Sequence, residues 1–258
     1  MKKQFTLAAI IFFLLIVRAN AQHNYTASAG EMIFSYGDVS TDSSDLSPIV
    51  RWSPVFNFQQ QFHFNFSSSV GIYTGLGIRN IGLISHISAD FEDITGTIFK
   101  RDITVKERAY SLGLPLALKL GNLDNGASVA IGAEAELMFN WKRKVIDEDQ
   151  KEKSTGWFDD HLNVFNPSGF VEVHFTKGQY IRFKYYFLDF LNYSGITLVD
   201  RDNNQSVVAD YGSKSPLFYV SIGSMTLKRN MGGTSAPKTT KATTYFKSDK
   251  NDVHWSNL

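Results

Sequence analysis

Length, composition and charge limit the classes of protein to which this chain can belong. It has 258 residues, a formal net charge of +1 and no Cys, and Phe alone accounts for 21 residues. The near-neutral charge argues against a nucleic-acid binder, and a chain without Cys has no disulfide to stabilise it. Stability must therefore come from packing or from the closure of strands on themselves.

The amino terminus has the features of an export signal. Two lysines precede an apolar run from Phe5 to Val17, and Ala19-Asn20-Ala21 supplies the small residues at which a signal peptidase cuts. The run is shorter than the roughly 20 residues of a membrane helix. We therefore predict a signal peptide at residues 1–21, removed after export; the atypical Arg18 leaves a retained anchor open as the alternative.

The strongest pattern of the chain lies between Val55 and Phe66, where Phe alternates with Asn, Gln and His. An extended strand sends alternate side chains to opposite faces, so one face here is almost entirely Phe. A strand that crosses a bilayer needs about 9–11 residues of such alternation. We therefore predict that one face meets lipid, through Phe56, Phe58, Phe62, Phe64 and Phe66.

Seven further segments alternate in the same way. They are Glu31–Gly37, Gly71–Arg79, Ala109–Leu120, Val129–Lys142, Val171–Phe175, Ile181–Phe187 and Phe218–Gly223. In the most regular of them every even position from 110 to 120 is Tyr or Leu. The residues of these segments that we predict to face lipid are Leu112, Leu114, Leu116, Leu118 and Phe183.

Irregularities are expected at two places in these segments. Pro115 has no N–H to donate, which predicts a bulge. A register slip is expected at Asn80, because Ile81 and Leu83 continue the apolar pattern on odd numbers. Trp141 falls on the outward, apolar phase. Aromatic residues near strand ends or in loops are expected to form an interfacial girdle: Trp52, Tyr73, Tyr110, Trp141, Trp157, Tyr180 and Tyr185.

Connection lengths alternate between short and long. The long, polar connections are Asp38–Pro48, His86–Lys106, Arg143–Leu162 and Asn192–Lys214. Strict alternation places all long loops at one end, as in outer-membrane barrels. We therefore predict an all-β fold: an eight-stranded antiparallel up-and-down transmembrane β-barrel at residues 22–227, with long external loops, short periplasmic turns and both mature termini in the periplasm. Residues 228–258 are polar and basic, and are predicted to be a flexible tail.

The inward face mixes small residues with ionisable ones. The predicted lumen charge network is Arg79, Lys119, Glu134, Glu136, Glu172, Arg182 and Lys184. These charges could line a narrow ion path or neutralise one another in a plugged lumen. We favour the plugged lumen, because an eight-stranded barrel is just wide enough to be filled by side chains. A soluble, lipocalin-like barrel is the alternative fold, but the many Gly residues on the polar face favour the membrane barrel.

An outer-membrane enzyme, acting on lipid A or phospholipid or as a protease, is the alternative function. Its candidate groups are His86 with Ser85 and Asp90, or His161 with Asp159 and Asp160. A Ser–His–acid site requires three groups that converge in space, and sequence proximity alone does not show this. No nucleophile elbow, metal-binding His-Glu-x-x-His or phosphate loop is present. The sequence therefore predicts no catalytic, cofactor or metal site.

Three runs, Gly75–Gly82, Tyr110–Lys119 and Arg182–Tyr186, resemble the PorT-like outer-membrane β-barrel proteins of Gram-negative bacteria. The resemblance implies an eight-stranded barrel and, for some members, a link to secretion or gliding machinery. It implies no catalytic residues. We predict a structural, transport- or secretion-associated, or surface-interaction role with specificity in loops 90–107 and 143–161. The expected partners are outer-membrane lipid and a periplasmic or secretion-machinery protein, and the oligomeric state stays open.

Overall fold

The computed structural model describes residues 23–39, 45–92, 96, 98–147, 150–193, 195–200, 205–209, 211 and 214–230. Within these ranges there is no helix long and apolar enough to cross a membrane. The predicted signal peptide at residues 1–21 and the predicted tail beyond Asn230 lie outside the described residues. The last strand runs to Asn230, so the predicted barrel end at Leu227 falls short of its end.

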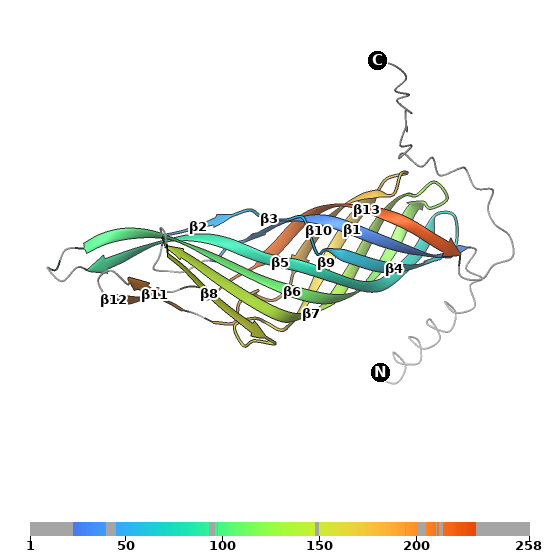
Figure 1. Ribbon diagram of the computed structural model, residues 1–258. Helices are drawn as coiled ribbons and strands as arrows, with labels where there is room; N and C mark the ends of the chain where they lie inside the picture. The colour runs from blue at the N-terminus through green and yellow to red at the C-terminus, as the bar shows by residue number, and fades with distance from the viewer. Residues whose placement is uncertain are drawn as a thin grey trace, which may run out of the picture.

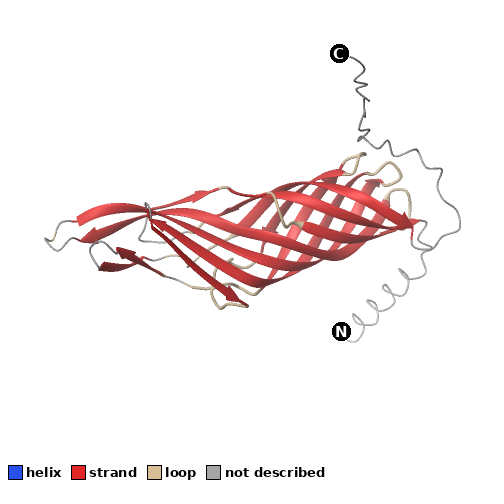
Figure 2. Ribbon diagram, in the orientation of Figure 1, coloured by secondary structure: helices blue, strands red, loops and turns tan. Residues whose placement is uncertain are grey.

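Eight strands close into an antiparallel barrel (Figures 1 and 2). They are β1 (His23–Gly37), β4 (Phe58–Asn65), β5 (Val70–Glu92), β6 (Ile98–Asn122), β7 (Ala127–Asp147), β9 (Phe165–His174), β10 (Gln179–Tyr186) and β13 (Leu217–Asn230). Each pairs with the next in this order, and β13 pairs with β1 to close the ring. The predicted eight-stranded antiparallel up-and-down barrel is confirmed, because each predicted segment overlaps one of these strands.

Strands β5, β6 and β7 continue well beyond the ring, as Figure 1 shows. There β2 (Asp45–Ile49) pairs with β5, and β8 (Gln150–Trp157) pairs with β7, which gives a sheet ordered β2-β5-β6-β7-β8. We call this sheet the extension. The short strand β3 (Arg51–Ser53) pairs with β1, and β11 (Ile196–Asp200) forms a separate hairpin with β12 (Gln205–Ala209). Within the described residues the long connections therefore contain β-structure in addition to loops, and this β-structure was not predicted from sequence.

The opposite end of the barrel, which we call the turn end, carries the short connections and both ends of the ring. The pairs His23–Asn65 and Tyr25–Asn230 place the start of β1 and the end of β13 there. Backbone hydrogen bonds join the turn after β4 to the turn after β6: Leu123 N–H donates to Ser68 O over 2.8 Å.

The inner face of β5 changes its chemistry without a change of register. Arg79, Ile81 and Leu83 are all fully buried on the same face, and β5 pairs continuously with β6 from Ile78 to Glu92. The predicted slip at Asn80 is therefore wrong. The apolar residues at odd positions mark the point where the interior changes from polar to a hydrophobic core. From this point on, the exterior of the extension carries charged and polar side chains.

The bulge is also found elsewhere than predicted. On one side Pro115 pairs in register with Glu134 of β7, without a bulge. On the other side its missing N–H faces a gap in the pairing of β6 with β5, between Thr74 and Gly77. The register of β6 against β7 shifts between Tyr110 and Ser111. This shift reverses the phase of β7 and turns Trp141 inward, where it is 3% exposed, so its predicted outward position is wrong.

Candidate functional site

The outside of the barrel is apolar around the whole ring. Leu114 and Leu116 are 56% and 61% exposed, although they lie in the middle of a paired strand. Exposed apolar side chains come from all eight strands and form what we call the apolar belt: Met32, Phe34, Phe58, Leu76, Ile78, Leu112, Leu114, Leu116, Leu118, Val129, Ile131, Leu137, Phe165, Val171, Val173, Ile181, Phe183, Val220 and Ile222. A continuous exposed apolar surface of this kind marks a membrane or protein interface.

The residues predicted to face lipid occupy different parts of this surface. Phe58, Phe183 and the four leucines of β6 belong to the apolar belt. Phe62, Phe64 and Phe66 are partly buried on the same outward phase of the chain. Phe56 is 56% exposed, but it precedes β4 and has a left-handed φ of 63°. Its ring makes an edge-on contact with Tyr110, with the ring centroids 6.1 Å apart.

The inside of the barrel is polar, and all seven predicted network residues are buried there. The guanidinium of Arg79 donates from Nε to Glu31 over 2.7 Å, from Nη2 to Gln59 over 3.0 Å, and from Nη1 to Glu134. These three partners come from β1, β4 and β7, so one side chain ties together strands far apart in the sequence. A planar guanidinium with five N–H donors suits such a multiple contact.

Arg182 of β10 makes a second set of contacts beside the first. It donates to Glu172, to Glu31 over 3.1 Å and to Gln59 over 2.6 Å. Glu172 also accepts hydrogen bonds from Tyr73 over 2.7 Å and, at 2.8 Å, contacts His174. Glu31 therefore joins the two arginines.

Glu31 and Gln59 belong to this network but were not among its predicted members. The signal was present, since within the predicted segment Glu31–Gly37 the residue Glu31 lies on the opposite phase to the apolar Met32 and Phe34. Gln59 lies on the polar phase of β4, but its role depends on which strands the ring brings opposite it.

Lys184 completes the network between two carboxylates of β7. Its Nζ donates to Glu134 over 2.6 Å and also contacts Glu136, which accepts a further hydrogen bond from Tyr186. Space for this group depends on Gly113, because a Cβ there would lie 2.0 Å from Glu134 Oε1. The small residues of the polar face thus make room for long, paired side chains.

Lys119 stands apart from the other predicted cations, nearer the turn end. Its Nζ donates to Asn65 over 2.8 Å and to the hydroxyl of Tyr25 over 3.2 Å, and lies 5.1 Å from the Tyr25 ring centroid. The structure therefore brings six of the seven predicted residues into one ion-pair network and leaves Lys119 with neutral partners.

The end of the lumen that faces the extension is filled by apolar side chains. Residues of the connection between β10 and β13, including Phe190, Leu191, Ile196 and Tyr211, are buried against the inner faces of β5 and β6. The hydrophobic cluster extends into the barrel as far as Tyr186 and Tyr219. The charged interior is thus covered on this side by a packed hydrophobic core.

The two candidate catalytic groups do not form a Ser–His–acid site within the described residues. Ser85 is buried while His86 and Asp90 are exposed, and the ring of His86 contacts Thr104 over 2.9 Å. Neighbouring residues of a strand point to opposite faces, so Ser85 and His86 are directed apart.

His161 does contact Asp159 through Nδ1, but Asp160 is exposed. The His161 ring stacks on Trp141 with centroids 4.4 Å apart and meets Tyr193 edge-on at 5.2 Å. Its described contacts include a carboxylate and two aromatic rings but no hydroxyl of a Ser, so they offer the pair no nucleophile.

Trp141, expected in the girdle, instead helps to bury Glu107 of β6. Glu107 accepts hydrogen bonds from Trp141 Nε1 over 2.7 Å, Arg143 Nε over 2.7 Å and Tyr193 over 2.6 Å. Tyr73 and Tyr180, also expected in the girdle, are buried in the lumen, so these three girdle predictions were wrong. Trp52 and Trp157 are 60% and 70% exposed, and Tyr185 is 43% exposed.

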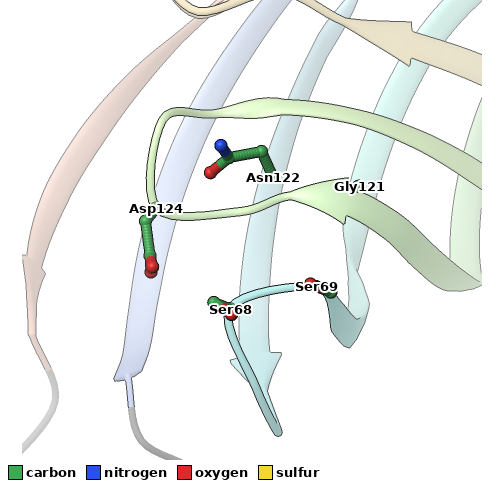
Figure 3. Close-up of a pocket in the computed structure, with 5 residues that line it drawn as sticks. All are labelled: Ser68, Ser69, Gly121, Asn122 and Asp124. Carbon is green, nitrogen blue, oxygen red and sulfur yellow. The ribbon is translucent and has the colours of Figure 1, made fainter.

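A shallow, open depression of about 450 Å³ lies at the turn end (Figure 3). Asn122 and Asp124 lie on one turn, Ser68 and Ser69 on its neighbour, and Gly121 completes the lining. The part of the chain that the structure describes holds no group of three His, Cys, Asp or Glu residues able to bind a metal.

No family model matches the chain, and no curated protein does. The similar solved structures include the attachment invasion locus protein Ail of Yersinia pestis, with 11% identity over 78% of this chain and 99% of that chain and a TM-score of 0.34. They also include the outer membrane protease OmpT from Escherichia coli, with 11% identity, 82% and 98% coverage and a TM-score of 0.40. The N-terminal β-barrel domain of OprF of Pseudomonas aeruginosa has 10% identity, 80% and 100% coverage and a TM-score of 0.27.

These TM-scores and identities are too low to carry any conclusion about activity. The pairing of this chain's own strands defines the architecture: a closed ring of eight antiparallel strands, apolar outside and polar inside. This is the arrangement of outer-membrane β-barrels, and it is the reverse of a lipocalin-like barrel, whose apolar residues surround an internal ligand.

Proposed function

We propose that the chain is an integral outer-membrane β-barrel with a closed interior, which holds the extension outside the membrane in a structural or surface-interaction role. The filled interior carries this proposal. Each of Arg79, Arg182 and Lys184 contacts at least two carboxylates. The hydrophobic core covers this network on the side that faces the extension. An ion path would require hydrated charges, whereas these are paired and withdrawn from solvent.

Conductance in a planar lipid bilayer tests the closed interior. We expect the reconstituted protein to give no discrete current steps above the empty bilayer. The double variant Arg79→Ser/Arg182→Ser is the control, because it removes the two largest fully buried side chains and empties the middle of the lumen. Discrete, reproducible steps from the unaltered protein would show that it is a pore.

The orientation follows from the length of the connections. In bacterial barrels the short turns face the periplasm and the longer connections face outward, so the extension lies outside and both ends of the ring face the periplasm. A barrel in this orientation has to be exported first, which is the role of the predicted signal peptide at residues 1–21. Protease added to intact cells should cut the extension and spare an epitope placed after Leu258. Loss of the epitope in intact cells would mean that the topology is inverted.

The resemblance to PorT-like proteins would add a transport- or secretion-associated role with a periplasmic or secretion-machinery partner. Since no family model matches the chain, this role stays a prediction. The lipid-facing role of the apolar belt is part of the proposal, and it is supported by the position of the belt around the whole ring.

A further inference from the structure

The outer face of the extension carries a concentrated set of basic side chains on three neighbouring strands, β6, β7 and β8, whose ribbons run side by side in Figure 1. The pairs Arg108–Lys142 and Lys106–Lys144 join β6 to β7, and Lys144–Lys153 joins β7 to β8. We call this set the basic wall: Lys106, Arg108, Lys142, Lys144, Lys151 and Lys153.

No carboxylate neutralises the basic wall within the described residues. The ion pairs of this region, such as Arg143 with Glu107, belong to the inner face. Like charges directly opposite one another in a sheet are destabilising. Partial desolvation and the nearby Lys151, Lys106, Lys153 and Lys142 together lower the pKa of Lys144. A surface that concentrates unpaired cations in this way fits an anion with several charges.

A row of aromatic side chains lies directly beside the basic wall, on the side towards the barrel. The rings of Tyr110 and Phe139 stack with centroids 6.3 Å apart, and those of Phe139 and Trp157 with centroids 5.9 Å apart. Trp157 is 70% exposed. Exposed Trp and Tyr beside an apolar band are typical of the boundary between hydrocarbon and head groups.

The spacing along β6 sets the order of these three zones. Leu112 of the apolar belt, Tyr110 of the aromatic row, and Arg108 and Lys106 of the basic wall occupy successive outward positions. Such positions are about 6.6–6.8 Å apart, and neighbouring strands are about 4.7–4.9 Å apart. The cations therefore begin one side-chain step beyond the aromatic row and are close enough together to contact one head group.

We propose that the basic wall binds the head group of a membrane lipid that carries two or more phosphates, with its acyl chains against the apolar belt. This rests on the proposed function, which places the apolar belt in the membrane. Continuity from belt to aromatic row to basic wall assigns the anion to a lipid, because a soluble polyanion would need no adjoining apolar surface. Lys and Arg near a membrane surface attract anionic lipids in this way.

The test is a titration of the full mature chain in neutral detergent micelles with diphosphoryl lipid A. The variant Arg108→Gln/Lys142→Gln/Lys144→Gln removes three charges from the basic wall. The control Lys100→Gln/Lys177→Gln/Lys214→Gln removes three exposed charges elsewhere. We expect the apparent Kd to rise about tenfold or more in the first variant, since each Lys or Arg contributes several-fold in affinity, and to stay nearly unchanged in the control.

Three results would overturn the proposal: an unchanged Kd in the basic-wall variant, an equal rise in the control, or equally tight binding of inorganic pyrophosphate, which would indicate a soluble polyanion. Retention of the heat-sensitive electrophoretic mobility of a folded barrel shows that each variant is intact. Insertion of the unaltered protein into phosphatidylcholine vesicles is measured separately. Failure of the unaltered protein to insert would contradict the proposed function. Normal insertion together with an unchanged Kd for lipid A in the basic-wall variant would contradict the lipid site alone.

Discussion

Arg79 lies at the centre of the barrel interior, where it donates hydrogen bonds to two carboxylates and one amide from three other strands. Its side chain is fully buried, so its charge is stabilised only by these partners. Removing one partner of a buried ion pair leaves the other charges without compensation, which costs more than the pair contributes net. The polar lumen is thus sensitive to single substitutions although it contains little hydrocarbon.

We expect Arg79→Met to lower the free energy of unfolding by about 3–5 kcal/mol, the usual cost of leaving a buried charge unpaired. Denaturant unfolding in lipid vesicles measures this difference. Lys177→Met is the matched control, because Lys177 is exposed in the turn after β9, and its effect should be within about 0.5 kcal/mol. Equal effects of the two substitutions would contradict the ion-pair network.

At the scale of elements, Glu107 links β6 and β7 to the connection that covers the lumen. Trp141 and Arg143 donate to it from β7, and Tyr193 donates from the connection after β10. It lies beyond the apolar belt, in the extension. Burial raises the pKa of Glu107 more than Arg143 and the hydrogen bonds from Tyr193 and Trp141 lower it.

This raised pKa predicts a pH dependence of stability. The folded state holds the proton of Glu107 more tightly than the unfolded state, so the contribution to stability is fully present below the ordinary carboxyl pKa and is lost as the pH rises through the folded pKa. We expect the free energy of unfolding of the unaltered protein, minus that of Glu107→Gln, to fall as the pH rises above the ordinary Glu pKa of about 4.3. A difference that grows as the pH rises would contradict the raised pKa.

The strands of the ring could be predicted from sequence because alternation with a period of two is a local property of the chain. The extension could not be distinguished from loops by sequence. Its strands carry apolar side chains inside and polar ones outside, the reverse of a membrane strand, so the outward apolar pattern stops at the end of the barrel and the rest of each strand reads as a polar connection. Trp141 shows the same limit, since the register shift that turns it inward depends on the pairing of β6 with β7. The inward position of the network residues could be predicted from their phase along each strand. The contact between Glu31 and both arginines could not, because it depends on which strands the closed ring brings together.

At the scale of the whole molecule, one continuous sheet serves two environments. In the barrel the side chains that face outward are apolar and those that face inward are charged. In the extension the same strands carry Lys106 and Arg108 outside and Val105 and Ile103 inside. With the apolar belt placed in the membrane as proposed, the position along β6 at which this pattern reverses is the boundary between the membrane and water.

The most direct test of this membrane boundary is a quenching profile along the outer face of β6. The natural sequence has no Cys, so a single fluorophore can be attached at Cys substitutions of Thr104, Lys106, Leu112, Leu114, Leu116 or Leu118, one at a time. In vesicles, lipids brominated in their acyl chains should quench the four belt positions, and a water-soluble quencher should act on Thr104 and Lys106. Efficient aqueous quenching at all six positions would contradict a transmembrane barrel.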